Sequence, residues 1–424
     1  MKELSPEIVS RSFADAKALY AQWGVDVEQA LRTLASIPLS IHCWQGDDVR
    51  GYEETEVLGG QGVQTTGSHP GRARTADELR ADFQTAASLI PGSHRFALHA
   101  NYAETGGKKV GRDRIGPEHF ARWMSWAKET GIKLDFNQTF FNHPLADSGF
   151  TLSSRDPKIR KFWVEHAIRC REIGEAMGRA QGSPCVVNLW IQDGYKDTPA
   201  DRFGPRQILK QSLDEVFARK LDPREELDTL EGKLFGVGTE SYVVGSHEFY
   251  IGYALKNDLL ITLDTGHYHP TETVTDKISS LLPFAKGLFL HVSRGIRWDS
   301  DHVVTLGDDL KALAAELVQA DAWDKVRIGT DFFDASINRI AAWVIGARST
   351  LRALLIALLE PAAEIRAAEL AGNLTARLAL QEEAKNLPFG AVWDEYCRRA
   401  TVPVGVAWIA KMAEHEATVL AKRR

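Results

Sequence analysis

The segment Leu259-Leu260-Ile261-Thr262-Leu263-Asp264-Thr265-Gly266-His267 decides the fold prediction. Its first part is a short apolar run of strand length, which is typical of a strand buried on both faces. The run ends in the carboxylate of Asp264, and Gly266 permits a tight turn that can bring His267 to the same end. The segment therefore predicts a buried parallel strand with chemically active side chains at its carboxyl end.

Similar apolar runs recur along the chain and alternate with longer segments that have helical spacing. Counting the opening segment as residues 259–264, eight strands are predicted, the others being 39–44, 96–99, 134–137, 186–190, 234–240, 287–292 and 326–331. Helices are predicted between them, for example over 117–128, 157–177 and 205–218, and three are expected to end at Gly131, Gly182 and Gly232. Strand and helix alternating eight times predicts a closed (β/α)₈ TIM barrel, an α/β fold whose active sites lie at the carboxyl ends of the strands.

Helical patterns flank the predicted barrel at both ends of the chain. Two precede it, at 6–23 and 27–35, and five follow it, at 339–359, 362–370, 376–385, 391–399 and 404–421. We therefore predict a barrel with N-terminal helices over 1–338 and an α-helical extension over 339–424 that serves oligomerisation. Residues 340–359 contain Arg348 and Arg352, so we interpret them as a buried helical pair instead of a membrane span. The Gly-rich stretch 45–75 is expected to form a lid or a subunit contact.

Composition narrows the class of partner. The chain of 424 residues is 44% hydrophobic and carries a net charge of −6, with acids and bases mixed throughout. It therefore offers no basic field for nucleic acid or an anionic membrane, which leaves small molecules, metals and its own copies as partners. Four widely spaced cysteines predict free thiols, and the polar, acidic N-terminus lacks a secretory pattern, so we expect a cytoplasmic protein.

Carboxylates and imidazoles gather at the ends of the last four predicted strands. These candidate metal ligands are Glu240, Asp264, His267, His291, Asp299, Asp301 and Asp334. Oxygen-rich ligands with some imidazole suit Mn²⁺, Mg²⁺, Co²⁺ or Zn²⁺. Asp299 and Asp301 are two residues apart, so in extended backbone they point the same way and can bind one ion. A single strand-end aspartate is more often a helix N-cap or a satisfied polar group than a ligand, but the convergence of seven such residues at one pole favours metal binding. Asp331 competes with Asp334 for the eighth-strand position, and His269 and His302 are equally ligands or outer and surface groups.

The first half of the predicted barrel supplies candidates for substrate handling. His99 ends the second strand and suits a general acid or a hydrogen bond to a sugar hydroxyl. Trp44 and Trp190 end the first and fourth strands, where their ring faces can stack on the C–H surface of a sugar. Structural burial is the alternative for all three residues.

Longer motifs resemble the L-rhamnose isomerase family of the long bacterial type. They are Leu263-Asp264-Thr265-Gly266-His267-Tyr268-His269-Pro270, Leu290-His291-Val292-Ser293-Arg294, Arg297-Trp298-Asp299-Ser300-Asp301-His302, Asp331-Phe332-Phe333-Asp334-Ala335-Ser336-Ile337-Asn338-Arg339 and Ile37-Pro38-Leu39-Ser40-Ile41-His42-Cys43-Trp44-Gln45-Gly46-Asp47-Asp48. The resemblance runs over essentially the whole chain. It implies a usually tetrameric barrel that interconverts L-rhamnose and L-rhamnulose with a catalytic and a structural metal.

The resemblance also implies a division of the ligands between two ions. His267, Asp299 and Asp301 would hold a catalytic Mn²⁺, with Co²⁺ or Mg²⁺ as alternatives. Glu240, His291 and Asp334 would hold a structural Zn²⁺ or Mn²⁺, and Asp264 would bridge the two ions. More distantly similar xylose isomerase has a lysine two residues after its first metal-binding glutamate, and Tyr242 stands at that position relative to Glu240.

The chemistry expected of such a site is a metal-assisted 1,2-hydride shift between C2 and C1 of an open-chain aldose. Asp301 would help to move the hydroxyl protons and His99 would assist ring opening. Proton transfer through an enediol is the alternative mechanism. The alternative functions are an isomerase that prefers another aldose, a metal-dependent phosphodiester hydrolase, which would want a basic groove, and a sugar-binding or scaffolding barrel without catalysis.

Overall fold

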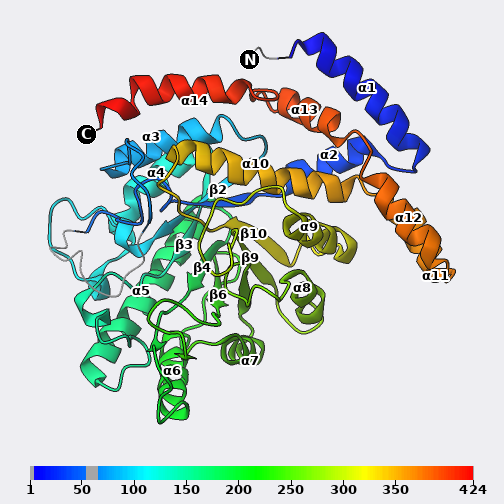
Figure 1. Ribbon diagram of the computed structural model, residues 1–424. Coiled ribbons are helices and arrows are strands. Elements are labelled where there is room, and N and C mark those ends of the chain that lie inside the picture. The colour runs from blue at the N-terminus through cyan, green and yellow to red at the C-terminus, as the bar shows by residue number, and fades with distance from the viewer. Residues whose placement is uncertain (1–3, 54–64, 424) are drawn as a thin grey trace.

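Eight parallel strands close into a barrel, so the predicted fold class is confirmed (Figure 1). The structure is a computed structural model that describes residues 4–53 and 65–423. In order around the barrel the strands are β1 (Leu39–His42), β2 (His94–His99), β3 (Lys133–Asn137), β4 (Cys185–Leu189), β6 (Glu226–Glu231), β8 (Leu260–Asp264), β9 (Leu288–Val292) and β10 (Val326–Thr330). Part of the stretch predicted as a lid or subunit contact, residues 54–64, lies outside the described residues.

One helix follows each barrel strand. These helices are α3 (Ala76–Ala87), α4 (Ala121–Thr130), α5 (Pro157–Gln181), α6 (Phe203–Val216), α7 (His247–Asn257), α8 (Thr275–Leu281), α9 (Asp308–Ala320) and α10 (Arg339–Leu358). Helix α5 begins where the Asp156 carboxylate accepts from Lys158 N and ends at Gly182, whose φ of 59° is left-handed. Helix α4 ends in the same way at Gly131, with φ of 74°, so both predicted glycine ends are confirmed.

The fifth barrel strand was predicted in the wrong place. Residues 234–240 form an irregular loop, and the strand is β6, eight residues earlier in the chain. Gly232 consequently follows a strand instead of ending a helix. The outer face of β6 hides the strand from a hydrophobicity pattern because it carries Asp228, which receives three hydrogen bonds from Arg171 of α5 at 2.8–3.0 Å.

Shorter elements lie in the loops of the barrel and, in the case of η5, after the last helix. A two-stranded antiparallel ribbon pairs β5 (Gly194–Tyr195) with β7 (Tyr242–Val243). The 3₁₀ helices are η1 (Ala100–Tyr102), η2 (Arg112–Arg114), η3 (Pro117–Phe120), η4 (Pro144–Ala146) and η5 (Leu420–Lys422).

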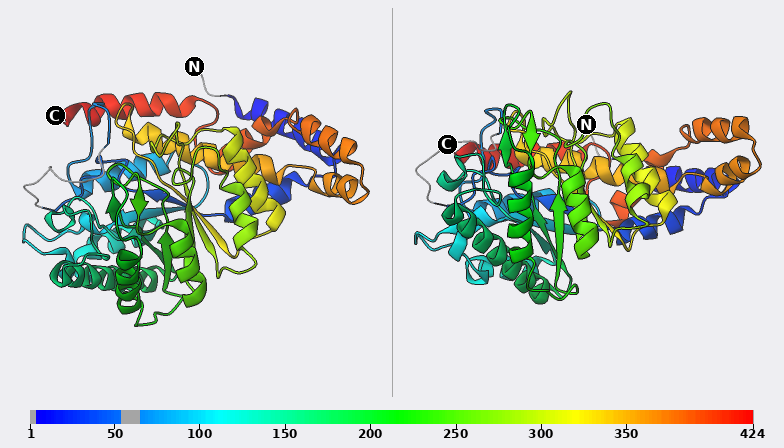
Figure 2. Two further views of the ribbon diagram at one scale, coloured as in Figure 1. Left: turned by 60° about the horizontal axis from the view of Figure 1, so that its bottom comes forward. Right: turned by 90° about the horizontal axis from the view of Figure 1, so that it is seen from below.

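The remaining helices gather on one side of the barrel. They are α1 (Pro6–Gln22), α2 (Val27–Ser36), α11 (Ala362–Leu370), α12 (Leu374–Ala384), α13 (Phe389–Arg399) and α14 (Ala407–Thr418). Helix α1 packs on α13, and α10 packs on α2, α3, α9 and β1, whereas α11 and α12 form a hairpin that extends away from the body (Figures 1 and 2).

Helix α10 is one continuous helix where a helical pair was expected. By length and composition it is the one helix among the described residues that would suffice to cross a membrane. However, 78% of its apolar window is buried inside the protein, against other helices and the barrel. Its apolar character is therefore that of a core helix, and the predicted burial is confirmed.

Candidate metal centre

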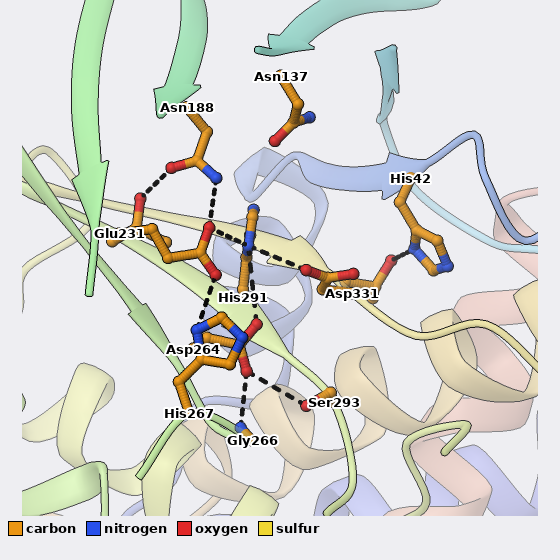
Figure 3. A network of polar contacts seen from close by, with 12 residues as sticks. His42, Asn137, Asn188, Glu231, Asp264, Gly266, His267, His291, Ser293 and Asp331 are labelled. Carbon is orange, nitrogen blue, oxygen red and sulfur yellow. Dashed lines mark hydrogen bonds and ion pairs between the residues drawn. The ribbon is translucent and has the colours of Figure 1, made fainter. Parts of the chain in front are cut away.

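Four side chains meet where β6, β8, β9 and β10 end (Figure 3). They are Glu231, Asp264, His291 and Asp331, and one ligand atom from each lies within 4.8 Å of the others. Parallel pairing explains the meeting, because Asp264 stands directly beside His291 in the ladder of β8 and β9. His291 Nδ1 lies 3.3 Å from oxygens of Glu231 and of Asp331. We call this set the first ligand group.

A second ligand group consists of Asp264, His267 and Asp299. His267 Nε2 lies 3.4 Å from Asp299 Oδ2, while His267 Nδ1 lies 3.2 Å from Glu231 Oε1 in the first group. Asp264 belongs to both groups and is fully buried. One carboxylate shared by two groups is the arrangement expected of two neighbouring cations.

Unpaired polar atoms show that the two groups suit cations. Asp264 Oδ2 and Asp299 Oδ1 are buried and have no hydrogen-bond partner among the described residues. Leaving such atoms unpaired is unfavourable unless an ion satisfies them. The residues present therefore fit divalent metals with mixed oxygen and nitrogen ligands.

The electrostatics of the cluster favour positive charge. Burial raises the pKa of Asp264 well above its ordinary value, and the carboxylates of Asp331, Glu231 and Asp299 raise it further. Burial alone would lower the pKa of His291, but Glu231 and Asp331 raise it well above the usual range. The carboxylates thus outweigh burial, and the same field that holds a proton on an imidazole would attract a metal ion.

Lys233 lies two residues after Glu231 and reaches the second ligand group. Its Nζ is 2.5 Å from Asp299 Oδ2 and stands 5.2 Å from the centroid of the Trp190 ring. Burial disfavours its charge, but Asp299 and Asp301 raise its pKa above the ordinary value. A lysine therefore does lie two residues after the glutamate of the first ligand group, so the departure inferred from Tyr242 depended on the misplaced Glu240. Tyr242 lies on the β5–β7 ribbon, with its hydroxyl donating to Arg202 O.

The backbone conformation of Asp301 and the missing side chain of Gly266 shape the site in ways that the sequence pattern did not predict. Asp301 has a φ of 45°, so its backbone is left-handed and not extended, yet its side chain lines the same pocket as Asp299. Gly266 is needed for close approach: a Cβ there would lie 2.5 Å from Asp299 Oδ1. Gly266 N also donates to Asp264 Oδ1 at 2.6 Å.

The aromatic and amide side chains of the first four strands line the opposite wall of this pocket. Trp44, His99 and Trp190 are all among the lining residues, together with Phe141. Trp44 Nε1 donates to Asp331 Oδ1 at 3.0 Å, and its ring meets His99 edge to face at 4.7 Å. Burial lowers the pKa of His99 to about 3, so its imidazole is neutral at physiological pH.

The proton of His99 is directed by a neighbouring hydroxyl. His99 Nδ1 lies 3.0 Å from Thr139 Oγ1, which already accepts a hydrogen bond from Ala100 N. If Thr139 donates its own hydrogen to Nδ1, the imidazole proton resides on Nε2, which makes no hydrogen bond with a described residue. This tautomer presents a donor to a ligand in the pocket.

Two predicted ligands lie elsewhere. Glu240 is exposed in the loop after β6, where it accepts from Gly238 N, and Glu231 takes its place because the strand itself was misplaced. Asp334 accepts from the backbone and hydroxyl of Ser336, so it closes a turn, and Asp331 is the residue in the first ligand group. Neither His269 nor His302 lines the pocket.

Sequence reasoning missed Glu231, Lys233 and Asn188. Asn188 of β4 donates to Glu231 Oε2 and accepts from the Thr262 hydroxyl at 2.9 Å, which fixes the orientation of the amide. The Glu231-Gly232-Lys233 sequence could have been recognised, because it has a lysine two residues after a glutamate. Glu240 is followed at that spacing by Tyr242 and does not fit the pattern.

Comparisons with known proteins agree over the whole barrel and its helical tail. The family model described as L-rhamnose isomerase (RhaA) matches residues 7–423. An L-rhamnose isomerase from Rhodopirellula baltica is 52% identical over 415 residues, which cover 98% of this chain and 97% of the relative. One from Mannheimia succiniciproducens is 52% identical over 98% of this chain and 99% of the relative. One from Escherichia coli is 53% identical over 96% of this chain and 97% of the relative. The chain belongs to the L-rhamnose isomerase family.

Proposed function

We propose that the chain interconverts L-rhamnose and L-rhamnulose at the pocket that contains both ligand groups, and that the reaction depends on divalent metal. The observation that carries the proposal is the pair of buried groups that share Asp264. Family membership supports the substrate, and the buried, unpaired ligand atoms support the metal requirement.

The two ions would be held by different sets of residues. Glu231, His291 and Asp331 would hold the structural ion, whereas His267, Asp299 and Asp301 would hold the catalytic ion, with Asp264 shared. We favour Mn²⁺, Co²⁺ or Mg²⁺ at the catalytic position and Zn²⁺ or Mn²⁺ at the structural one. When bound, such ions polarise the sugar oxygens and stabilise the negative charge that develops during isomerisation.

The protein side chains position the sugar and handle its protons. Trp44 and Trp190 offer ring faces to the C–H surface of the substrate, and His99 offers a neutral N–H for ring opening. Lys233 places a positive charge beside Asp299, where it can stabilise a developing oxyanion. Asp301, whose pKa is raised by burial and by Asp299, is suited to exchanging a proton with a sugar hydroxyl.

Hydrogen would pass between C2 and C1 as a hydride. Two ions held around Asp264 would stabilise the charge on the sugar oxygens, and Asp301 would exchange only hydroxyl protons. Isomerisation in D₂O tests it: the product should carry almost no deuterium at C1. Substantial incorporation would instead establish the enediol mechanism.

The activity itself is tested by a metal-restoration assay. The protein is stripped with a chelator, then supplied singly with Mn²⁺, Co²⁺, Mg²⁺ or Zn²⁺, and assayed on L-rhamnose, L-mannose and L-lyxose. We expect turnover only after metal is restored, and fastest with L-rhamnose. Faster turnover of another aldose would reassign the substrate, and no turnover of any aldose would contradict the proposal.

The α11–α12 hairpin is the segment that we assign to self-association, with a tetramer as the expected assembly. No residue of α12 is buried in the single chain, and Leu370, Leu374 and Leu378 are 82%, 56% and 57% exposed. A second copy of the chain would remove these leucines from water. Light scattering should report a tetramer for the wild type and smaller species when all three leucines are changed to serine; an unchanged mass would contradict this assignment.

The four buried free cysteines support a reducing compartment, in keeping with the cytoplasm.

A further inference from the structure

A second cavity lies at the opposite mouth of the barrel, where the strands begin. It has a volume of about 220 Å³ and is lined by residues of β1, β2, β3, β9 and β10 and by the segments that precede β1, β4 and β10. One water occupies roughly 30 Å³ in the liquid, so the cavity has room for a small polyatomic ion with water. Phe289 separates it from the metal centre, since the Phe289 ring lies against both this cavity and His291.

Arg327 of β10 points into this cavity. Arg327 lies two residues before Gly329 in β10, so both residues face the same side of the strand. That side is the barrel interior, because a Cβ added at Gly329 would lie 2.9 Å from the Phe289 ring. Arg327 is half-buried, and its guanidinium makes no hydrogen bond or ion pair within residues 4–53 and 65–423. Five N–H donors are therefore directed into a partly dehydrated cavity without a protein acceptor.

The one carboxylate that lines the cavity is already saturated. Asp135 Oδ1 accepts from Arg95 at 2.8 Å and from Val186 N at 2.8 Å. Asp135 Oδ2 accepts from Arg95 at 2.7 Å and from the Ser40 hydroxyl at 2.7 Å. All lone pairs of this carboxylate are thus in use, and its negative charge is balanced by Arg95. Arg327 therefore shares the field of this one carboxylate with Arg95, and the described lining of the cavity has a net positive charge.

A further donor lines the same cavity as Arg327. The Ser183 oxygen accepts from Arg95 at 3.2 Å, which leaves the Ser183 hydrogen available to a ligand. A net positive cavity with a planar guanidinium and a hydroxyl donor matches the chemistry of an oxyanion. We propose that the amino-terminal mouth of the barrel binds a small tetrahedral oxyanion of the phosphate or sulfate class, held by Arg327 and Ser183.

Titration calorimetry on the metal-loaded protein tests the site, with sulfate as the probe and sodium chloride of equal ionic strength as the reference. Arg327→Met should weaken sulfate binding about tenfold or more, since it removes charge-assisted hydrogen bonds. Arg366→Met, which removes an exposed arginine of α11, is the matched control and should bind as the wild type does. Glycerol 3-phosphate in place of sulfate tests whether a phosphomonoester also fits.

Two further measurements separate this site from the metal centre and from a structural role. The KM for the sugar should be the same with and without sulfate in all variants, because the cavity is outside the metal pocket. In sulfate-free buffer Arg327→Met should unfold at a temperature no lower than the wild type, because it removes an unpaired, half-buried charge. A large loss of thermal stability would show that Arg327 has a structural partner and would overturn the proposal.

Crystals soaked in selenate should give an anomalous peak beside Arg327. Equal sulfate affinity in wild type and Arg327→Met overturns the proposal. A selenate peak without binding in solution means an adventitious ion only, which overturns it as well.

Discussion

The two halves of the barrel's carboxyl-terminal rim are built from different chemistry. The half formed by β6, β8, β9 and β10 carries carboxylates, imidazoles and Lys233. The half formed by β1 to β4 lines the same pocket with aromatic rings, side-chain amides and the neutral His99, and among the described residues it contributes no carboxylate to the pocket. The contrast supports the proposal made above, in which the charged half holds the ions and the aromatic half faces the sugar.

Several contacts join the two walls near the ligands: Asn188 of β4 donates to Glu231, and Lys233 lies over the Trp190 ring. Trp44 of the sugar-facing half donates to Asp331 of the charged half at 3.0 Å. A candidate metal ligand therefore helps to orient the Trp44 ring. A substitution in one half should change the properties of the other half only through contacts of this kind. The following variants test how separate the two halves are.

The largest effect is expected from Asp264→Asn, which removes the charge shared by both ligand groups. Activity should fall about a thousandfold or more, because transition-state charge stabilisation of this kind is the largest catalytic contribution. Metal content by mass spectrometry should fall for both ions while circular dichroism stays unchanged. Asp334→Asn is the control and should retain activity. Loss of only one ion in Asp264→Asn would contradict the shared role.

The second effect compares two glutamates in the charged half. Glu231→Gln should lower activity and affinity for one ion about a hundredfold, whereas Glu240→Gln should change neither more than about twofold, since Glu240 is exposed outside the pocket. Steady-state kinetics and metal titration measure both. The reverse ranking would restore the position expected from the sequence.

The third effect lies in the sugar-facing half. His99→Asn should lower kcat/KM about tenfold to a hundredfold, through loss of ring opening, and leave the metal content unchanged. Because burial lowers its pKa to about 3, His99 gains no proton as the pH falls from 8 to 5, and the pH profile should show no inflection from it in that interval. The control is His269→Asn, an exposed residue outside the pocket. A parallel loss of metal in His99→Asn would break the division between the halves.

The smallest effect is expected from Gly266→Ala. The added Cβ would stand 2.5 Å from Asp299 Oδ1 and displace that ligand without removing it, so activity should fall about tenfold. Added Mn²⁺ should restore part of the loss. Gly252→Ala, a helical position with nothing within 4 Å of a new Cβ, should be as active as the wild type. Full activity in Gly266→Ala would mean that Asp299 is not held closely.

Seven barrel strands were predictable because each is a short apolar run that helices cover from outside. Strand β6 was not, because it reads Glu-Leu-Asp-Thr-Leu-Glu and has Asp228 on its outer face. That carboxylate is tolerated only because Arg171, 57 residues earlier, neutralises it. A polar pair buried between a helix and a strand is invisible to a local pattern.

The misplaced strand shifted both the predicted glutamate ligand and the position at which a lysine was sought. Placing the strand at 234–240 led to Glu240 and Tyr242, and the correct strand end leads to Glu231 and Lys233. The sequence could not decide whether Asp331 or Asp334 joins the ligand group, for a different reason. Both follow β10 closely, and it is the direction of each side chain, toward His291 or toward Ser336, that separates them.

The sequence by itself determined the barrel, the helical tail and the residue types of the site, since apolar periodicity and the polar ends of strands are local properties. Tertiary structure alone decided which carboxylates meet, because that depends on strand register, on the left-handed backbone at Asp301 and on the close approach of Gly266 to Asp299. It also decided that the one carboxylate lining the cavity of Arg327 is already bonded to Arg95, because the contacts of Asp135 join distant segments of the chain.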